Sequence, residues 1–275
     1  MKLGSHEGPF YCYGKERFKK MKEYGFDYLD YSINGELNGR TEEEYRDAIL
    51  ADKALINEAD ITVWQVHGPW RYPPHDETEE HRAERAEVMR RSIRMTAELG
   101  CKYWVIHPIM PFGPDDDFDR DRFFQINLEF FRALLPYAKE RGVTICLENM
   151  PMKRLSISTT EGTLSFIRMI NDENFKLCLD TGHEAAFGRN VSDAVRLAGN
   201  DLKTLHVHDS DGRHDKHWVP YMGVIDWNAF KLALSEIGFD GVLSLEISFD
   251  GFLANASNDL KLEALKAVTR DLVKD

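Results

Sequence analysis

The sequence predicts an α/β fold, a single-domain (β/α)8 barrel that covers residues 1–275. Three observations predict it. Eight apolar runs alternate with eight helical patterns along the chain. The apolar runs are mostly continuous, as expected for parallel strands that are covered on both faces. Glycine also stands at four junctions between a helical pattern and the next strand, where a left-handed residue commonly ends a helix: Gly25, Gly100, Gly142 and Gly238.

The expected strands are short runs of residues that favour β structure. In chain order they are Lys2–Ser5, Tyr28–Ile33, Thr62–Val66, Tyr103–His107, Val143–Glu148, Lys176–Asp180, Thr204–His208 and Val242–Ile247. Eight strand-helix units in a chain of this length are typical of a barrel.

The expected helices have apolar residues at helical spacing between polar ones. They are Glu16–Tyr24, Glu42–Asp60, Thr78–Leu99, Arg120–Arg141, Thr160–Ile170, Val191–Ala198, Asn228–Ile237 and Asp259–Val273. Ser192 and Asp226 are the expected N-caps of the sixth and seventh of these helices, because their side-chain oxygens suit that position.

An open doubly wound sheet is the alternative architecture. That fold usually carries a GxGxxG turn after its first strand, and no such turn follows the first expected strand here. The longest irregular segments all follow strands. In a barrel they lie at the C-terminal face, where active sites are built: Gly68–Asp76, Pro108–Asp119, Pro151–Ser158 and Asp209–Asp226.

Composition narrows the possible partners. The formal net charge is -12, which disfavours nucleic acid as a partner because a polyanion needs a basic surface. No run of about 18 apolar residues is present, so we expect no membrane partner. The N-terminal residues lack a signal pattern, and the four cysteines are widely spaced, so we expect free thiols and a cytoplasmic location.

Four expected strands in the second half of the chain end in a metal-ligand type of side chain: Glu148, Asp180, His206 and Glu246. Parallel strands of a barrel end at the same mouth, so these side chains are expected to converge. Residues two apart on a strand share a face. The small residues two positions earlier are therefore expected to fill the barrel core beneath the site: Cys146, Cys178, Thr204 and Ser244.

Three carboxylates and one imidazole suit one divalent metal ion, of manganese, zinc, cobalt or magnesium. Without a cation the crowded carboxylates would repel one another and shift their pKa values. Each residue taken singly could simply cap a strand or bond a neighbouring loop, but the four together favour a metal site.

Five further residues of the same chemical types are expected at the same mouth, where they bind substrate or additional metal ions. They are His67, His107, His183, Asp215 and His217. A lone histidine at such a position is more often a hydrogen-bonding core residue, and it is the grouping that favours function. We assign His208 to the surface or to a position behind the ligands.

Several motifs resemble those of the xylose isomerase-like TIM barrels. They are Cys146-Leu147-Glu148-Asn149, Leu179-Asp180-Thr181-Gly182-His183, His206-Val207-His208-Asp209-Ser210-Asp211-Gly212, Asp215-Lys216-His217 and Ser244-Leu245-Glu246. The second and third resemble the sugar phosphate isomerase/epimerase branch, which includes ketose 3-epimerases. That branch usually has Pro-Gly-x-Gly after the Asp-x-His pair, whereas Tyr221 replaces the first glycine here. We expect this loop to differ in shape and in the substrate it accepts.

The resemblance implies one metal ion held by Glu148, Asp180, His206 and Glu246, with the two glutamates as the acid and base on opposite faces of a small carbohydrate. It implies substrate contacts from His183 and from an arginine shortly after the metal histidine, for which Arg213 is the candidate. A metal ion at the carbonyl would stabilise the enediolate left by proton removal. Epimerisation and aldose–ketose isomerisation both remain open, as does a homo-oligomer.

Three other functions stay open. The nine metal-type residues also match in type the ligands of endonuclease IV, a multi-zinc phosphodiesterase, although the chain has no basic stripe for DNA. A keto-inositol dehydratase uses related chemistry in the same superfamily. A non-catalytic sugar-binding barrel would leave the two glutamates without a role.

Overall fold

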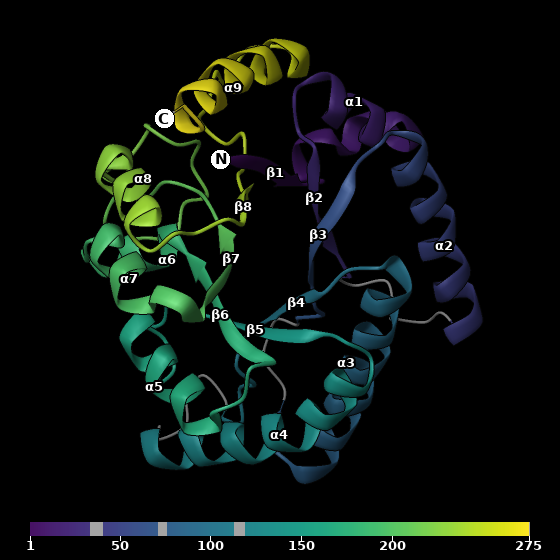
Figure 1. Cartoon of the computed structure of the whole chain (residues 1–275), viewed down its shortest axis with the longest axis vertical. Coiled ribbons are helices and arrows are strands. Elements are labelled where there is room, and N and C mark those ends of the chain that lie inside the picture. The colour runs from purple at the N-terminus through teal and green to yellow at the C-terminus, as the bar shows by residue number, and fades with distance from the viewer. Residues whose placement is uncertain (34–40, 71–75, 113–118, 275) are drawn as a thin grey trace.

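A computed structural model describes residues 1–33, 41–70, 76–112 and 119–274. Its eight parallel strands form one sheet in the order β7-β6-β5-β4-β3-β2-β1-β8, which curls into a nearly closed barrel (Figure 1). The strands are β1 (Lys2–His6), β2 (Tyr28–Ser32), β3 (Thr62–His67), β4 (Tyr103–Ile106), β5 (Thr144–Glu148), β6 (Phe175–Asp180), β7 (Leu202–His206) and β8 (Val242–Leu245). The predicted (β/α)8 barrel is confirmed.

The helices lie around the outside of the strands (Figure 1). They are α1 (Arg17–Glu23), α2 (Glu42–Glu58), α3 (Glu79–Leu99), α4 (Arg120–Glu140), α5 (Thr160–Ile170), α6 (Thr181–Ala186), α7 (Val191–Ala198), α8 (Trp227–Glu236) and α9 (Asn258–Leu272), with 3-10 segments η1 (Gly8–Glu16) and η2 (Gly199–Asp201). Among the helices of the described residues, none is both long enough and apolar enough to cross a membrane.

The barrel closes at the seam between β7 and β8. Val207 donates its backbone N–H to Ser244 O at 2.8 Å and accepts from the N–H of Glu246 at 3.1 Å. These bonds lie just beyond His206, at the mouth. The seam therefore brings His206, at the end of β7, beside Glu246, directly after β8, which an open sheet would not do.

The core has two parts. A large apolar cluster fills the space between strands and helices, and a small one inside the barrel joins Val105, Cys146 and Cys178. Cys146, Cys178, Thr204 and Ser244 are all buried. Small residues therefore lie inside the barrel beneath the strand ends, as predicted.

The predicted helix ends are largely confirmed. All four junction glycines have left-handed φ values, of 94° at Gly25, 80° at Gly100, 68° at Gly142 and 65° at Gly238. Asp226 caps α8 by accepting the N–H of Ala229 at 3.0 Å. The prediction of Ser192 as the cap of α7 is wrong.

The cap of α7 is Asn190. Its Oδ1 accepts the N–H of Ser192 at 2.9 Å. An asparagine two residues earlier reaches the free N–H groups at the helix start, so Ser192 lies within the first turn.

Candidate metal centre

Four side chains meet at the C-terminal mouth of the barrel. Glu148, Asp180 and His206 end β5, β6 and β7, and Glu246 follows the last residue of β8. One ligand atom from each lies within 4.8 Å of the ligand atoms of the others. The structure thus brings together the four residues that the sequence predicts to converge.

The Nδ1 atom of His206 is the centre of this group. It lies 3.1 Å from Glu148 Oε1, 3.1 Å from Glu246 Oε2 and 4.0 Å from Asp180 Oδ2. Burial alone would lower the pKa of this imidazole, but the acidic groups of Cys178, Glu246 and Glu148 hold that pKa well above its usual value. In the absence of a metal ion, the protonated ring therefore supplies positive charge to the carboxylates around it.

Two of the carboxylates are fully buried and ionised. Burial raises the pKa of Glu148, but the imidazoles of His206 and His107 bring it well below its usual value. The pKa of Asp180 is lowered in the same way, by His183 and His208 acting against burial. Ionised buried carboxylates are stable only with positive partners, and a metal ion is the strongest such partner.

The residues fit a divalent cation. Glu148 Oε2 and His206 Nδ1 are buried, and neither makes a well-aligned hydrogen bond to a described residue. Buried polar atoms without partners are rare in folded proteins. Three carboxylates and one imidazole are donors that Mn²⁺, Zn²⁺, Co²⁺ and Mg²⁺ accept. A bound ion would therefore supply the missing partner for both atoms.

Asn149 ties two of the ligand-bearing strands together. Its side chain accepts the N–H of Asp180 at 2.7 Å through Oδ1 and donates to Asp180 O at 3.0 Å through Nδ2. The side-chain amide thus adds two hydrogen bonds between the chain segments just beyond the last paired residues of β5 and β6. It fixes the backbone of Asp180 next to Glu148.

One flank of the centre consists of His67 and His107. Their Nε2 atoms lie 3.6 Å and 3.2 Å from Glu148 Oε2. Burial lowers the pKa of both rings. At His67 the interaction with Glu148 outweighs burial, so the pKa of this ring is raised. At His107 burial outweighs the interaction with Glu148, so the pKa of this ring is lowered. These two imidazoles and Glu148 form a second group with metal-binding geometry.

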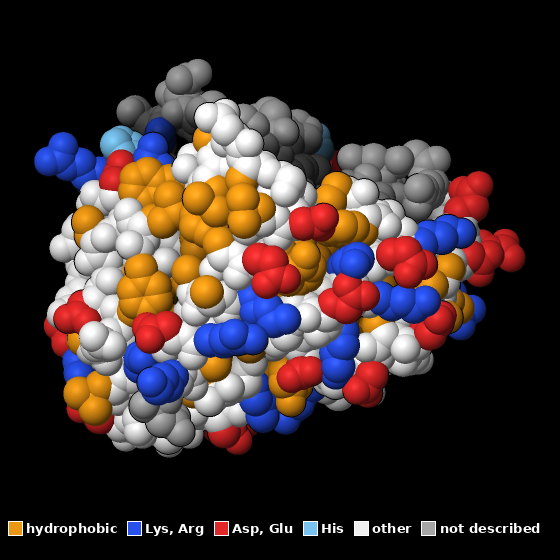
Figure 2. All heavy atoms as spheres, turned by 90° about the horizontal axis from the view of Figure 1, so that it is seen from above, with side chains coloured by type: hydrophobic (Ala, Val, Ile, Leu, Met, Phe, Trp, Pro, Cys, Tyr) orange, Lys and Arg blue, Asp and Glu red, His pale blue; other side chains and the backbone are white. Residues whose placement is uncertain are grey.

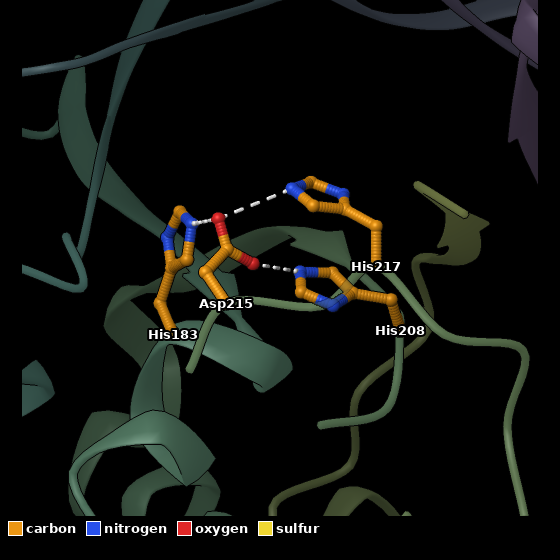
Figure 3. A group of neighbouring side chains, drawn as sticks. All are labelled: His183, His208, Asp215 and His217. Atoms are coloured by element: carbon orange, nitrogen blue, oxygen red, sulfur yellow. Dashed lines mark hydrogen bonds and ion pairs between the residues drawn. The ribbon is translucent and has the colours of Figure 1, made fainter. Parts of the chain in front are cut away.

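The other flank consists of His183, His208, Asp215 and His217 (Figure 3). Asp215 Oδ2 lies 3.2 Å from the Nε2 atoms of both His183 and His217. Burial lowers the pKa of both rings, but the surrounding carboxylates raise each to about 10. Burial raises the pKa of Asp215, whereas its two hydrogen-bonded histidines lower it well below the usual value.

Backbone carbonyls orient three of these imidazoles. The Nδ1 atoms of His67, His183 and His217 each lie 2.8 Å from a carbonyl oxygen, of Gly68, Asn149 and Glu246 respectively. A carbonyl can only accept, so Nδ1 carries the proton in each ring. In the neutral ring Nε2 is then bare, as a metal ligand or a substrate hydrogen-bond acceptor requires.

A cavity of about 290 Å³ opens above the centre. Its walls combine ligand-type side chains with apolar ones: His67, Trp70, Asp76, Arg85, His107, Pro108, Met110, Glu148, Met150, Pro151, Met152, His183, Asp215, His217 and Glu246. Such a volume suits a small molecule.

Arg213 lies outside the cavity and outside the groups of ligand-type residues around it. Its side chain is exposed, its backbone N–H is donated to Asp211 Oδ1 at 2.9 Å, and it does not line the cavity.

The loop from β7 to α8 is folded around Asp209. Its carboxylate accepts the backbone N–H of Ser210 at 2.9 Å and of Ile225 at 3.2 Å, and the indole N–H of Trp227 at 3.0 Å. Tyr221 in this loop has a left-handed φ of 73°. Tyrosine therefore occupies a conformation that favours the glycine expected at this position.

Two buried residues of the centre were not among the predicted site residues. His208 is fully buried and places Nε2 2.9 Å from Asp180 Oδ2, so of the two positions expected for it the one behind the ligands is correct. Its separation of two residues from His206 could have indicated this. Asp30 is also buried, and its position inside an apolar strand was the available signal.

Comparison with known proteins supports this description of the fold. The family model for the xylose isomerase-like TIM barrel matches residues 18–270. Inosose isomerase of Bacillus subtilis (strain 168) is 28% identical over 156 residues, which are 54% of this chain and 55% of that protein. This match spans only about half the length of the relative.

The D-psicose 3-epimerase of Ruminiclostridium cellulolyticum is 25% identical over 258 residues, which are 87% of this chain and 82% of that protein. Among solved structures, D-psicose 3-epimerase in the presence of D-fructose superposes with a TM-score of 0.79 at 18% identity, over 98% of both chains. The IOLI protein with a bound zinc atom superposes with a TM-score of 0.77 at 22% identity, over 99% of this chain and 98% of that one.

At these identities the solved structures establish the fold, and the family match extends over most of the chain. The chain therefore belongs to the xylose isomerase-like TIM barrel family.

Proposed function

We propose that the protein is a divalent-metal-dependent isomerase or epimerase that acts on a sugar, a sugar phosphate or a keto-polyol. One observation carries the proposal. Glu148 and Glu246 approach the same nitrogen of His206 at 3.1 Å from different strands, and both line the cavity. Relatives named as epimerases and isomerases of small carbohydrates support it.

Glu148 and Glu246 are the proposed acid and base. A divalent ion held by Glu148, Asp180, His206 and Glu246 would stabilise negative charge that develops on a substrate carbonyl oxygen. One glutamate takes the proton from the carbon beside the carbonyl, which leaves an enediolate, and the other returns a proton. Return to the opposite face of the same carbon gives an epimer, and return to the neighbouring carbon gives an isomer.

The surrounding histidines would bind the substrate. The Nε2 atoms of His183 and His217 lie beside Asp215 at the cavity wall, within reach of sugar hydroxyls. His67 and His107 line the opposite flank, next to Glu148. Arg213, exposed in the structure, would contact substrate only after a movement of its loop.

Deuterium exchange from solvent tests the reaction directly. Mass spectrometry of ketoses, ketose phosphates and keto-inositols incubated with the protein in D₂O should find label beside the carbonyl of the active substrate. Glu246→Gln should slow that exchange by about 10²-fold or more, because it removes one acid–base group. Unchanged exchange in this variant would show that the two-base assignment is wrong.

Glu184→Gln is the matched control. Glu184 is a buried carboxylate outside the cavity, held by Thr160 and Arg189. The Glu184→Gln variant should keep the exchange activity of the wild type.

Loss of water from a keto-inositol in the same assay would instead favour the dehydratase.

A multi-zinc phosphodiesterase is the second candidate, because four groups with metal-binding geometry adjoin one another among the described residues. Glu148 belongs both to the central group and to the group with His67 and His107. His67 also forms a group with His206 and Glu246, and the remaining group contains Asp215. The net charge of -12 argues against a DNA substrate. Basic and acidic side chains are also intermingled on the face in Figure 2, without a basic band.

Metal analysis separates the two candidates. Protein purified without chelator should contain close to one divalent ion per chain if it is an epimerase of the proposed kind. Three zinc ions per chain, together with cleavage of DNA that contains abasic sites, would support the phosphodiesterase instead.

A further inference from the structure

We propose that Asp30 is a positioning residue that holds the ring of His206 with its Nδ1 atom free to bind metal, and thereby sets the metal affinity. The inference rests on the metal site of the proposed function. Asp30 itself touches neither the cavity nor the other three ligand side chains in any described contact.

The contact crosses the interior of the barrel. Asp30 lies in β2 and His206 ends β7, and the sheet order places β8 and β1 between them. Asp30 Oδ2 lies 3.0 Å from His206 Nε2, which is an ion-pair distance, although the two atoms are not aligned as a hydrogen bond. Asp30 is only 1% exposed and His206 is fully buried, so water cannot replace either partner.

Gln65 holds the carboxylate in place. Its Nε2 donates to Asp30 Oδ2 at 2.8 Å and to Leu205 O at 3.2 Å, directly before His206. The amide thus links β3, β2 and β7 at one depth in the barrel. Among the described residues, Asp30 has no ion pair with lysine or arginine, and the imidazole is its one cationic partner.

The chemistry of the imidazole fixes the consequence. A neutral ring carries one proton, and the nitrogen without it binds metal. Once a metal ion replaces the proton on Nδ1 between Glu148 and Glu246, the proton that remains on Nε2 faces the carboxylate of Asp30. The opposite tautomer would turn a lone pair toward the buried carboxylate, which is repulsive. Asp30 therefore selects the metal-binding tautomer.

His206 differs in this respect from the flanking rings. His67, His183 and His217 have Nδ1 on a backbone carbonyl and Nε2 toward the mouth. His206 is turned the other way, with Nδ1 toward the other ligands and Nε2 toward a side chain. Carboxylate partners of this kind typically change metal affinity by about 10- to 100-fold.

Asp30→Asn tests the inference, because it removes the charge and keeps the shape. The probes are Zn²⁺, measured by competition with a chromogenic chelator, and Co²⁺, measured by the visible absorption of the loaded protein. We expect Asp30→Asn to weaken Zn²⁺ binding by about 10- to 100-fold and to change the Co²⁺ spectrum. Asp30→Glu should restore part of the affinity, which a purely structural role does not predict.

Glu184→Gln is the control, since it also removes a buried carboxylate but lies outside the site. It should leave the affinity and the spectrum unchanged. If Asp30→Asn does not fold, Gln65→Met carries the test. This variant removes the donor that orients Asp30 and should weaken Zn²⁺ binding by a few-fold, whereas unchanged binding overturns the inference.

Two outcomes distinguish the inference from its premise. Wild-type protein that binds Zn²⁺, with Asp30→Asn equal to it in affinity and spectrum, overturns the role of Asp30 alone. Wild-type protein that binds neither ion at its four ligands overturns the proposed function, and the role of Asp30 with it.

Discussion

Gly182 shows how closely the side chains around the centre are packed. A Cβ atom at this position would lie 1.9 Å from Cε1 and 2.2 Å from Nδ1 of His208. The His208 ring is fully buried and bonded to Asp180, so it has no space to move into. The glycine is therefore required by the imidazole packed against it.

We predict that Gly182→Ala destabilises the protein by about 1–3 kcal/mol, the usual effect of overpacking. In an ordinary helix the same change stabilises by up to about 1 kcal/mol, so the sign is informative. Urea unfolding measures the effect, and a Zn²⁺ titration should show weaker binding because His208 contacts Asp180. A stability equal to or above the wild type would contradict the close packing.

The sequence predicts the four central residues because each ends an apolar run with a charged or imidazole side chain. Asp30 could not be assigned to the site in the same way. Its partner is 176 positions away on a strand that is not its neighbour, so only the curvature of the closed barrel brings them together. Arg213 was predicted from a motif alone, and its side chain is exposed in the structure.

Helices and strands were predictable where the spacing of apolar residues repeats over several turns and where a capping residue marks the end. α5 and α7 have the predicted bounds, and every strand was found to within a few residues. α6 was missed because six residues are too few for a helical period to appear. Asp180 starts this helix by accepting the N–H of His183 at 2.6 Å, so a predicted metal ligand is also a helix cap.

Tyr221 gives a test at the level of the β7–α8 loop. Its left-handed φ of 73° costs a residue with a side chain about 1–2 kcal/mol. Alanine and glycine both remove the ring contact with Trp227 and the hydrogen bond to Asp271, but only alanine keeps the strain. We predict that Tyr221→Gly is more stable than Tyr221→Ala by about 1 kcal/mol.

Thermal unfolding of the two variants, side by side with the wild type, measures this difference. A glycine variant that is less stable than the alanine variant would show that the loop relaxes when the ring is removed.

The whole molecule should depend on pH when it is free of metal. The pKa values of His183 and His217 are raised to about 10 in the folded protein, against about 6.5 in an unfolded chain. A group whose pKa is raised on folding contributes stability that is fully present below its pKa in the unfolded chain. That contribution is lost as the pH rises through its pKa in the folded protein. We therefore predict that the melting temperature of the metal-free protein falls between about pH 6.5 and 10.

Bound metal should change this profile. Binding displaces protons from ligand imidazoles, so Zn²⁺ should bind more tightly as pH rises and should flatten the fall in melting temperature. Calorimetric scans with and without chelator measure both curves, and His217→Gln should show a shallower fall than wild type without metal. A metal-free melting temperature that stays constant over this range would contradict the charge assignment.

The tie between the imidazoles and the backbone has a consequence for inheritance. The carbonyls of Gly68, Asn149 and Glu246 hold three rings, and no point substitution can delete a carbonyl from a chain. His206 depends on the side chain of Asp30, which one nucleotide change can remove. A single substitution at Asp30 can therefore remove the partner that orients His206, whereas substitution cannot remove the carbonyl partners of the other three rings.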